Sequence, residues 1–144
     1  MKRFIAIGLF LSLLCASFSA RADDTEQATL AARQFQKMVS ENKLNALWDT
    51  LVSKQFKEQV SKNTFLANLS QGRASVGGPF ESSELVDVTY NNPQPETGYK
   101  TEFYACRFLT TYPAGKFYES FFMVKETDGQ YRLGGVFSAP APHD

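Results

Sequence analysis

Glu102 and Glu126 are two acidic residues whose spacing places them opposite each other at one end of a predicted β-hairpin. Two carboxylates that share a site away from water have one raised pKa, which suits general acid–base chemistry. Tyr104, two residues after Glu102, lies on the same strand face and could donate a hydrogen bond to a developing oxyanion. These three residues support one hypothesis, a small acid–base enzyme. The alternative is that acids at a sheet end are solvated and do no chemistry.

Other residues could line a ligand pocket. Asp49 follows Trp48 in a predicted helix, where it either reaches the pocket or stays an exposed helix acid. Arg73, after the last predicted helix, could bind an anionic ligand or cap the carbonyl groups at a helix end, and we favour the cap. The candidate pocket residues are Trp48, Asp49, Arg73, Tyr104, Tyr118 and Phe122.

Several common chemistries are disfavoured by the residues present. The one histidine of the chain, His143, lies in the C-terminal tail, which argues against a Ser-His or Cys-His nucleophile and against a histidine metal site. Cys106 falls on the strand face that we expect to be covered, so we interpret it as a small buried hydrophobic residue. Gly134–Gly135 lies in a predicted strand with no helix after it, which is unlike a phosphate loop. We expect no cofactor, no metal and no catalytic residue.

Charge and length exclude further classes. The chain has 144 residues, with 15 Lys plus Arg against 15 Asp plus Glu, so nothing in its charge points to nucleic acid as a partner. Its length fits one domain, and its 14% aromatic content does not suit a disordered chain.

The first 22 residues have the three parts of a secretory signal peptide. Lys2 and Arg3 precede an apolar run over 4–14, and Ala20-Arg21-Ala22 is a cleavage site of the A-x-A kind. The run is too short for a membrane span, which needs about 20 residues. Lipid attachment at Cys15 would require a small residue before it, and Leu14 stands there. We therefore expect cleavage after Ala22 and a periplasmic or secreted protein without a membrane span.

Hydrophobic spacing then predicts helices followed by strands. The first helical pattern begins at Asp24, which could cap it, and ends at Asn42. A second helical pattern covers 44–52, and a short helical turn covers 56–60. A fourth pattern begins with Ser61 as its cap and ends at about Gly72. Gly77-Gly78-Pro79 ends the helical part. A period of two predicts strands over 81–91, 99–112, 116–126 and 130–138.

Two turns fix the expected register of the sheet. Pro113-Ala114-Gly115 fits a three-residue hairpin loop, and Asp128-Gly129 fits a two-residue one. Cys106 then opposes Phe122, Tyr104 opposes Val124, Val124 opposes Leu133 and Phe122 opposes Gly135. The face covered by helices would carry Tyr104, Cys106, Phe108, Tyr118, Phe122, Val124, Tyr131, Leu133 and Phe137.

The opposite sheet face is expected to be about half apolar. It would carry Phe103, Ala105, Leu109, Phe121, Met123 and Val136 among charged residues. Such a face either packs on a second copy or another protein, or is shielded by the stems of Arg and Lys.

Short segments spread over most of the chain carry a family resemblance. They include Ala31–Phe35, Leu47-Trp48, Glu119–Val124 and Glu126–Gly135. On these residues the chain resembles the domain-of-unknown-function family 4019, small exported bacterial proteins. It departs from the family pattern at Phe65 and Tyr131, where Trp is common, and at Val136, where Tyr is common.

The resemblance and the element order together imply a fold but no activity. Helices before a curved antiparallel sheet resemble the cystatin-like cone, which is also the fold of nuclear transport factor two. The expected class is α+β, with N-terminal helices packed on a curved four-stranded antiparallel sheet. We expect a signal peptide over 1–22, a single domain over 23–138 and a flexible tail over 139–144.

Two functions from different classes are consistent with these observations, because related cones include enzymes and binding proteins. The favoured one is an exported non-catalytic module that binds a small apolar ligand, a protein partner or a second copy of itself. The alternative is a small isomerase- or hydrolase-like enzyme that uses a carboxylate and Tyr104. An inhibitor of an exported toxin or hydrolase would fit the size and location, but no residue supports it.

Overall fold

The computed structural model describes residues 8–94, 96 and 101–142, with side chains described from Arg21 onward. The described elements are α1 (Gly8–Ser40), α2 (Leu44–Leu51), α3 (Lys54–Gln59), α4 (Lys62–Ser75), β1 (Ser82–Asn91), β2 (Phe103–Tyr112), β3 (Gly115–Lys125) and β4 (Tyr131–Pro140). Helices precede one antiparallel sheet of order β1-β2-β3-β4, which confirms the α+β class.

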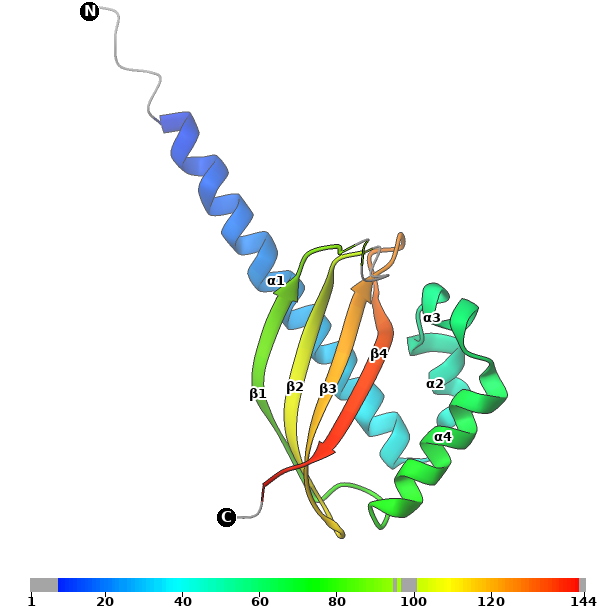
Figure 1. Cartoon of the computed structure of the whole chain (residues 1–144). Coiled ribbons are helices and arrows are strands. Elements are labelled where there is room, and N and C mark those ends of the chain that lie inside the picture. The colour runs from blue at the N-terminus through cyan, green and yellow to red at the C-terminus, as the bar shows by residue number, and fades with distance from the viewer. Residues whose placement is uncertain (1–7, 95, 97–100, 143–144) are drawn as a thin grey trace, which may run out of the picture.

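The helices form a second layer against the sheet. In Figure 1 the C-terminal half of α1 passes behind the strands, and α2, α3 and α4 lie together beyond the β4 edge. Val52, which follows α2, forms a parallel bridge with Leu133 of β4, and Ser53 N donates to Leu133 O at 2.9 Å. These contacts hold the short helices beside β4 rather than over the centre of the sheet.

The first helix begins earlier than its apolar spacing predicts. We expected a start capped by Asp24, but α1 runs without a break from Gly8 to Ser40, so Asp24 lies within it. No proline interrupts this stretch and its residues are mostly helix formers, so nothing stops the helix at Asp24. The expected cleavage point after Ala22 falls inside α1, and residues 1–7 lie outside the described part of the chain.

The later helix ends follow their sequence signals. Ser61 caps α4 by accepting a hydrogen bond from Thr64 N at 3.2 Å, as its type predicts. After α1, Asn42 takes a positive φ of 57°, a conformation that asparagine tolerates. Gly77 and Gly78 have φ values of 88° and 118° and turn the chain from α4 toward β1.

The register between β2 and β3 differs from the expected one by one residue. Tyr112 pairs directly with Gly115, so Pro113-Ala114 is a two-residue turn and Gly115 already belongs to β3. Cys106 therefore opposes Phe121 rather than Phe122. Contacts with the end of α4 hold this turn: Ala114 N donates to Val76 O at 3.1 Å. The residue types of the turn alone cannot predict this contact with a distant segment.

A one-residue shift moves every side chain of β3 to the other face. Phe121 and Met123 are buried under the helices, whereas Tyr118, Phe122 and Val124 alternate onto the outer face. Tyr104 correspondingly opposes Met123, not Val124.

A bulge restores part of the expected pairing with β4. Phe122 opposes Gly135 as predicted, but Leu133 opposes Met123 rather than Val124, because the register shifts between Phe122 and Met123. Leu133 thus stays buried, at 0% exposure, while Phe137, beyond the bulge, is 62% exposed instead of covered. The loop into β4 is also longer than predicted, since Glu126 N donates to Gln130 O around Asp128-Gly129.

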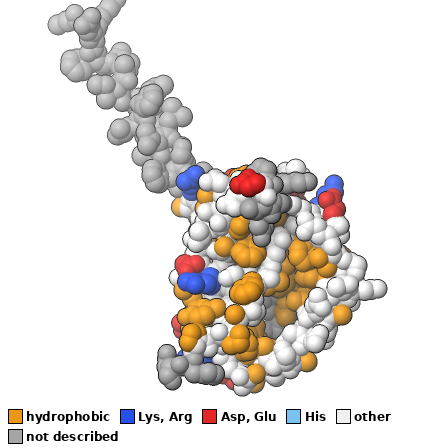
Figure 2. All heavy atoms as spheres, viewed as in Figure 1, with side chains coloured by type: hydrophobic (Ala, Val, Ile, Leu, Met, Phe, Trp, Pro, Cys, Tyr) orange, Lys and Arg blue, Asp and Glu red, His pale blue; other side chains and the backbone are white. Residues whose placement is uncertain are grey.

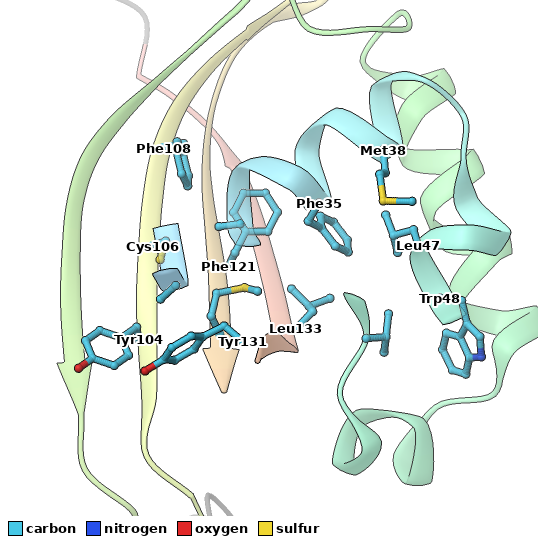
Figure 3. Packing of buried hydrophobic residues seen from close by; sticks show 14 of the residues in the cluster. Phe35, Met38, Leu47, Trp48, Tyr104, Cys106, Phe108, Phe121, Tyr131 and Leu133 are labelled. Atoms are coloured by element: carbon cyan, nitrogen blue, oxygen red, sulfur yellow. The ribbon is translucent and has the colours of Figure 1, made fainter. Parts of the chain in front are cut away.

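The core lies between α1, α2 and the inner face of the sheet. Figure 3 shows Phe35 pointing toward Phe121, and their ring centroids are 5.4 Å apart. Trp48 of α2 packs on Phe65 of α4 at 5.2 Å. Cys106 is fully buried, in agreement with its interpretation as a core residue.

The outer face of the sheet keeps the expected Phe103 of β2, whereas β3 contributes Phe122 to it instead of the expected Phe121. Phe103 and Phe122 meet edge to face at 5.5 Å, and Arg107 lies over the Tyr118 ring while pairing with Asp87 at 2.6 Å. Figure 2 shows hydrophobic side chains gathered over this face of the sheet.

The last strand extends into the segment that we expected to be a tail. Ala139 pairs with Tyr118 and Pro140 with Phe117, and Ala141 N donates to Lys116 O at 2.8 Å. Pro140 is tolerated because β4 is an edge strand. His143 lies outside the described residues.

Candidate ligand pocket

A pocket of about 760 Å³ lies between the helical layer and the β4 side of the sheet. Its walls come from α1, α3, α4, β2, β3 and β4. Figure 2 shows the hollow between β4 and α4, with hydrophobic side chains inside it. A concave site of this size suits a small organic molecule.

Most of the pocket wall is apolar. The lining hydrophobic residues are Phe35, Val39, Phe56, Val60, Phe65, Leu69, Val76, Phe117, Phe121, Phe122 and Val136. Phe65 is in edge-to-face contact with Phe35 at 6.4 Å and with Phe56 at 5.4 Å. The interlocked rings make this part of the wall rigid, since each restricts the rotation of the next.

A polar cluster is built into the same wall around Glu119 of β3. Tyr112 Oη donates to Glu119 Oε1 at 2.9 Å, and Gln36 Nε2 donates to Glu119 Oε2 at 3.0 Å. Gln36 Nε2 also lies 3.1 Å from Thr110 Oγ1, and Gln36 Oε1 accepts from Ser83 Oγ at 3.1 Å. The 5%-exposed Gln36 side chain therefore has partners at both ends.

The Tyr112 hydroxyl is held in its neutral form. Burial raises the pKa of Tyr112 far above its ordinary value, and the nearby Glu119 carboxylate, which accepts its hydrogen bond, raises it further. Tyr112 is thus a fixed hydrogen-bond donor at any physiological pH.

Arg73 supplies a second polar feature of the wall. Its Nη2 donates to Ser40 O at the end of α1 at 3.3 Å, so it does cap a helix-end carbonyl, the role favoured by its position. Its Nε is buried and has no hydrogen-bond partner within the described residues. Among the described lining residues, Arg73 is the one cation and Glu119 the one anion.

Two glycines of β4 make room for side chains of the outer sheet face. A Cβ atom added to Gly135 would lie 2.9 Å from Phe122 Cδ2, and one added to Gly134 would lie 3.1 Å from Val124 Cγ1. The absence of side chains at both positions leaves room for the Phe122 ring beside the bulge.

Of the six residues proposed from sequence, Arg73 and Phe122 line the pocket, although the ring of Phe122 packs against Phe103 on the outer sheet face. Trp48 lies in the core under Lys57, whose Nζ is 5.6 Å from its ring centroid. Tyr104 is also in the core, 5.3 Å from Tyr90 and 5.8 Å from Tyr131. The remaining two lie elsewhere: Asp49 is exposed and pairs with Lys62, and Tyr118 is on the outer face.

The two carboxylates considered as a dyad bind different partners. Glu102 accepts a hydrogen bond from Tyr90 Oη at 2.6 Å. Glu126 pairs with Arg132 at 2.7 Å and accepts from Lys54 N at 2.6 Å. Neither lines the pocket.

Gln36, Tyr112 and Glu119, which form the polar cluster of the pocket wall, were not among the residues proposed from sequence. A signal existed for two of them. Gln36 lies four residues after Ala32, on the buried face of α1, and Glu119 alternates with Phe117 and Phe121 along β3. With the expected register, however, Glu119 belonged to the outer face.

The structure shows no metal site and no membrane span in the part of the chain that it describes. No group of three His, Cys, Asp or Glu residues there could hold a metal ion. No helix in that part is long and apolar enough to cross a membrane.

Comparison with known proteins gives one match. The sequence profile of the family described as "Protein of unknown function (DUF4019)" matches residues 31–136. Neither the curated proteins nor the solved structures include a significant match to the chain.

Proposed function

The chain belongs to the family of proteins of unknown function DUF4019, and from that premise we propose that it is a non-catalytic module whose pocket binds a small, mainly apolar ligand. The observation that carries this proposal is the 760 Å³ pocket with a mainly aromatic and aliphatic wall. Apolar walls with a few placed polar groups are typical of small-molecule sites. The sequence adds an expected signal peptide, so we place the module in the periplasm or outside the cell.

The test measures the binding of decanol, a neutral and mainly apolar probe, by native mass spectrometry or calorimetry. Leu69 lines the pocket, and Leu69→Trp should fill it and abolish binding. Leu30, 51% exposed on α1, gives the matched control Leu30→Trp, which should bind as the wild type does. Equal binding by both variants would refute the pocket as the site.

If the protein were an enzyme, Glu119 would be the candidate carboxylate in the pocket. Tyr104 is buried in the core and does not line the pocket, whereas Glu119 and Tyr112 do. Both Glu119 oxygens already accept hydrogen bonds, which suits a structural role better than a free general base. The module hypothesis predicts that Asp49→Asn, Glu102→Gln and Glu126→Gln leave ligand binding intact.

A second copy of the chain is the partner that we propose for the outer sheet face. Phe137 is 62% exposed, and the charged pair Arg107–Asp87 on the same face is already satisfied within one chain. Apolar contacts would therefore dominate such an interface. Light scattering at micromolar concentration should give twice the mass of one chain for the wild type. The Phe137→Ser variant should have the mass of a single chain. A monomeric wild type would refute the dimer.

The arrangement of helices before an antiparallel sheet also agrees with the expected cystatin-like cone. In that interpretation the pocket beside β4 corresponds to the open end of the cone. We propose this likeness from the element order and the position of the pocket.

A further inference from the structure

We infer that the pocket recognises amphiphilic carboxylates, with the anionic head at Arg73 and the apolar tail along α4 toward Phe56. This inference rests on the proposed function and specifies its ligand class. It starts from Arg73, which lines a pocket large enough for a ligand and whose buried Nε–H has no hydrogen-bond acceptor among the described residues. A buried donor without an acceptor is unfavourable, so a ligand oxygen that reaches this N–H would gain a hydrogen bond that the protein alone does not supply.

The distribution of polar groups gives the pocket a direction. Ser40 and Arg73, from the last turns of α1 and α4, form one end. Phe56, Val60 and Phe65, from α3 and the start of α4, form the other end. Phe65 and Arg73 are eight residues apart on α4, about 12 Å at 1.5 Å per residue. A ligand with one polar end and a linear tail of about ten carbons matches this layout.

The charges favour an acid over an alcohol. Glu119, the one anion among the described lining residues, already accepts hydrogen bonds from Gln36 and Tyr112, which offset part of its charge. Arg73 donates from Nη2 to a backbone carbonyl and forms no ion pair with a carboxylate among the described residues, so its charge has no anionic partner there. Hydrogen bonds from a guanidinium to a carboxylate are roughly twice as strong as those between neutral groups.

The experiment compares decanoate with decanol on the purified protein at neutral pH. The wild type should bind decanoate about tenfold more tightly than decanol, the ratio expected for one charge-assisted hydrogen bond. Arg73→Met should lose this preference while still binding decanol, and its decanol binding reports that the pocket is intact. Arg107→Met, on the outer face, is the matched control and should keep the preference.

The possible binding results test the proposed function, the carboxylate preference and the role of Arg73 separately. If the wild type binds neither compound, the proposed function fails; if it binds both equally, only the carboxylate inference fails. A preference that persists in Arg73→Met overturns the assignment of the head group. Should Arg73→Met not fold, Arg73→Lys keeps the charge and can still reach the end of α1 but lacks Nε. Full preference for decanoate in Arg73→Lys would overturn the role of Nε, and at least a threefold loss is expected.

Discussion

Gln36 on α1 donates a 3.0 Å hydrogen bond to Glu119 Oε2 on β3, joining two residues 83 positions apart at the wall of the pocket. The same amide contacts Thr110 and Ser83, so one buried side chain links the helix to three strands. The position of α1 over the sheet, and therefore the shape of the pocket, depends on this residue.

Replacing Gln36 with Leu should destabilise the fold. Glu119, Thr110 and Ser83 would each lose a hydrogen bond in a water-poor site, and the expected loss is about 1–3 kcal/mol of unfolding free energy. Gln34, exposed on the same helix, provides the matched control Gln34→Leu, with little change expected. Denaturant titration measures both, and equal midpoints for the two variants would contradict a structural role for Gln36.

Tyr112 should make stability fall at alkaline pH. Its pKa in the folded state is far above the ordinary value of about 10, so above pH 10 the unfolded chain loses this proton while the folded one keeps it. The free energy of unfolding then decreases by at most about 1.4 kcal/mol per pH unit, less some solvent screening. Tyr112→Phe should flatten this alkaline decline between pH 10 and 11, whereas Tyr118→Phe on the outer face should not. An unchanged slope in Tyr112→Phe would argue against the buried hydrogen bond.

Cys106 should be unreactive in the native protein. Burial raises the pKa of its thiol to about 11, although a hydrogen bond with Thr29 acts in the opposite direction. In a Cys15→Ser background, where Cys106 is the sole thiol, a disulfide reagent at pH 8 should react only after denaturant is added. Rapid reaction of the native protein would mean that this part of the core opens readily.

Two glycines that line the pocket should respond oppositely to alanine. A Cβ at Gly135 would come within 2.9 Å of the Phe122 ring, so Gly135→Ala should shift that ring and cost about 1–3 kcal/mol. Gly72 lies within α4 with nothing within 4 Å of an added Cβ, so Gly72→Ala should gain about 0.5–1 kcal/mol from helix propensity. Thermal melting of both variants checks the pair, and a stabilised Gly135→Ala would show that the Phe122 ring can move to accept a side chain there.

The order of the helices and strands could be predicted from the sequence, because the caps and turns that end each element depend on neighbouring residues. The Ser61 cap and the glycine pair after α4 act through neighbouring backbone atoms, and they lie where their residue types predict. The register could not be predicted, because the Pro113-Ala114 turn is held by Val76, far from it in sequence. That single residue of shift moved Phe121 into the core and Glu119 onto the inner face.

The candidate site was partly predictable for the same reason. Arg73 was proposed because a cation near a helix end can bind the free carbonyl groups there or an anion, and it does lie at the pocket. Trp48 and Tyr104 were chosen for their aromatic bulk, but large rings fill cores as readily as they line pockets. Whether a large ring fills the core or lines the pocket depends on where α4 lies relative to β4, which is a property of the tertiary structure.

The most direct test of the account is to map where an apolar ligand binds. Titration of the isotope-labelled protein with decanol, followed by amide chemical shifts, should perturb residues around the pocket, with the largest changes near Gln36, Leu69 and Gly135. Residues of the outer face near Phe103 and Phe137 should change little. Changes centred on the outer face, or none at millimolar decanol, would contradict the proposal that this protein binds a small ligand between α4 and β4.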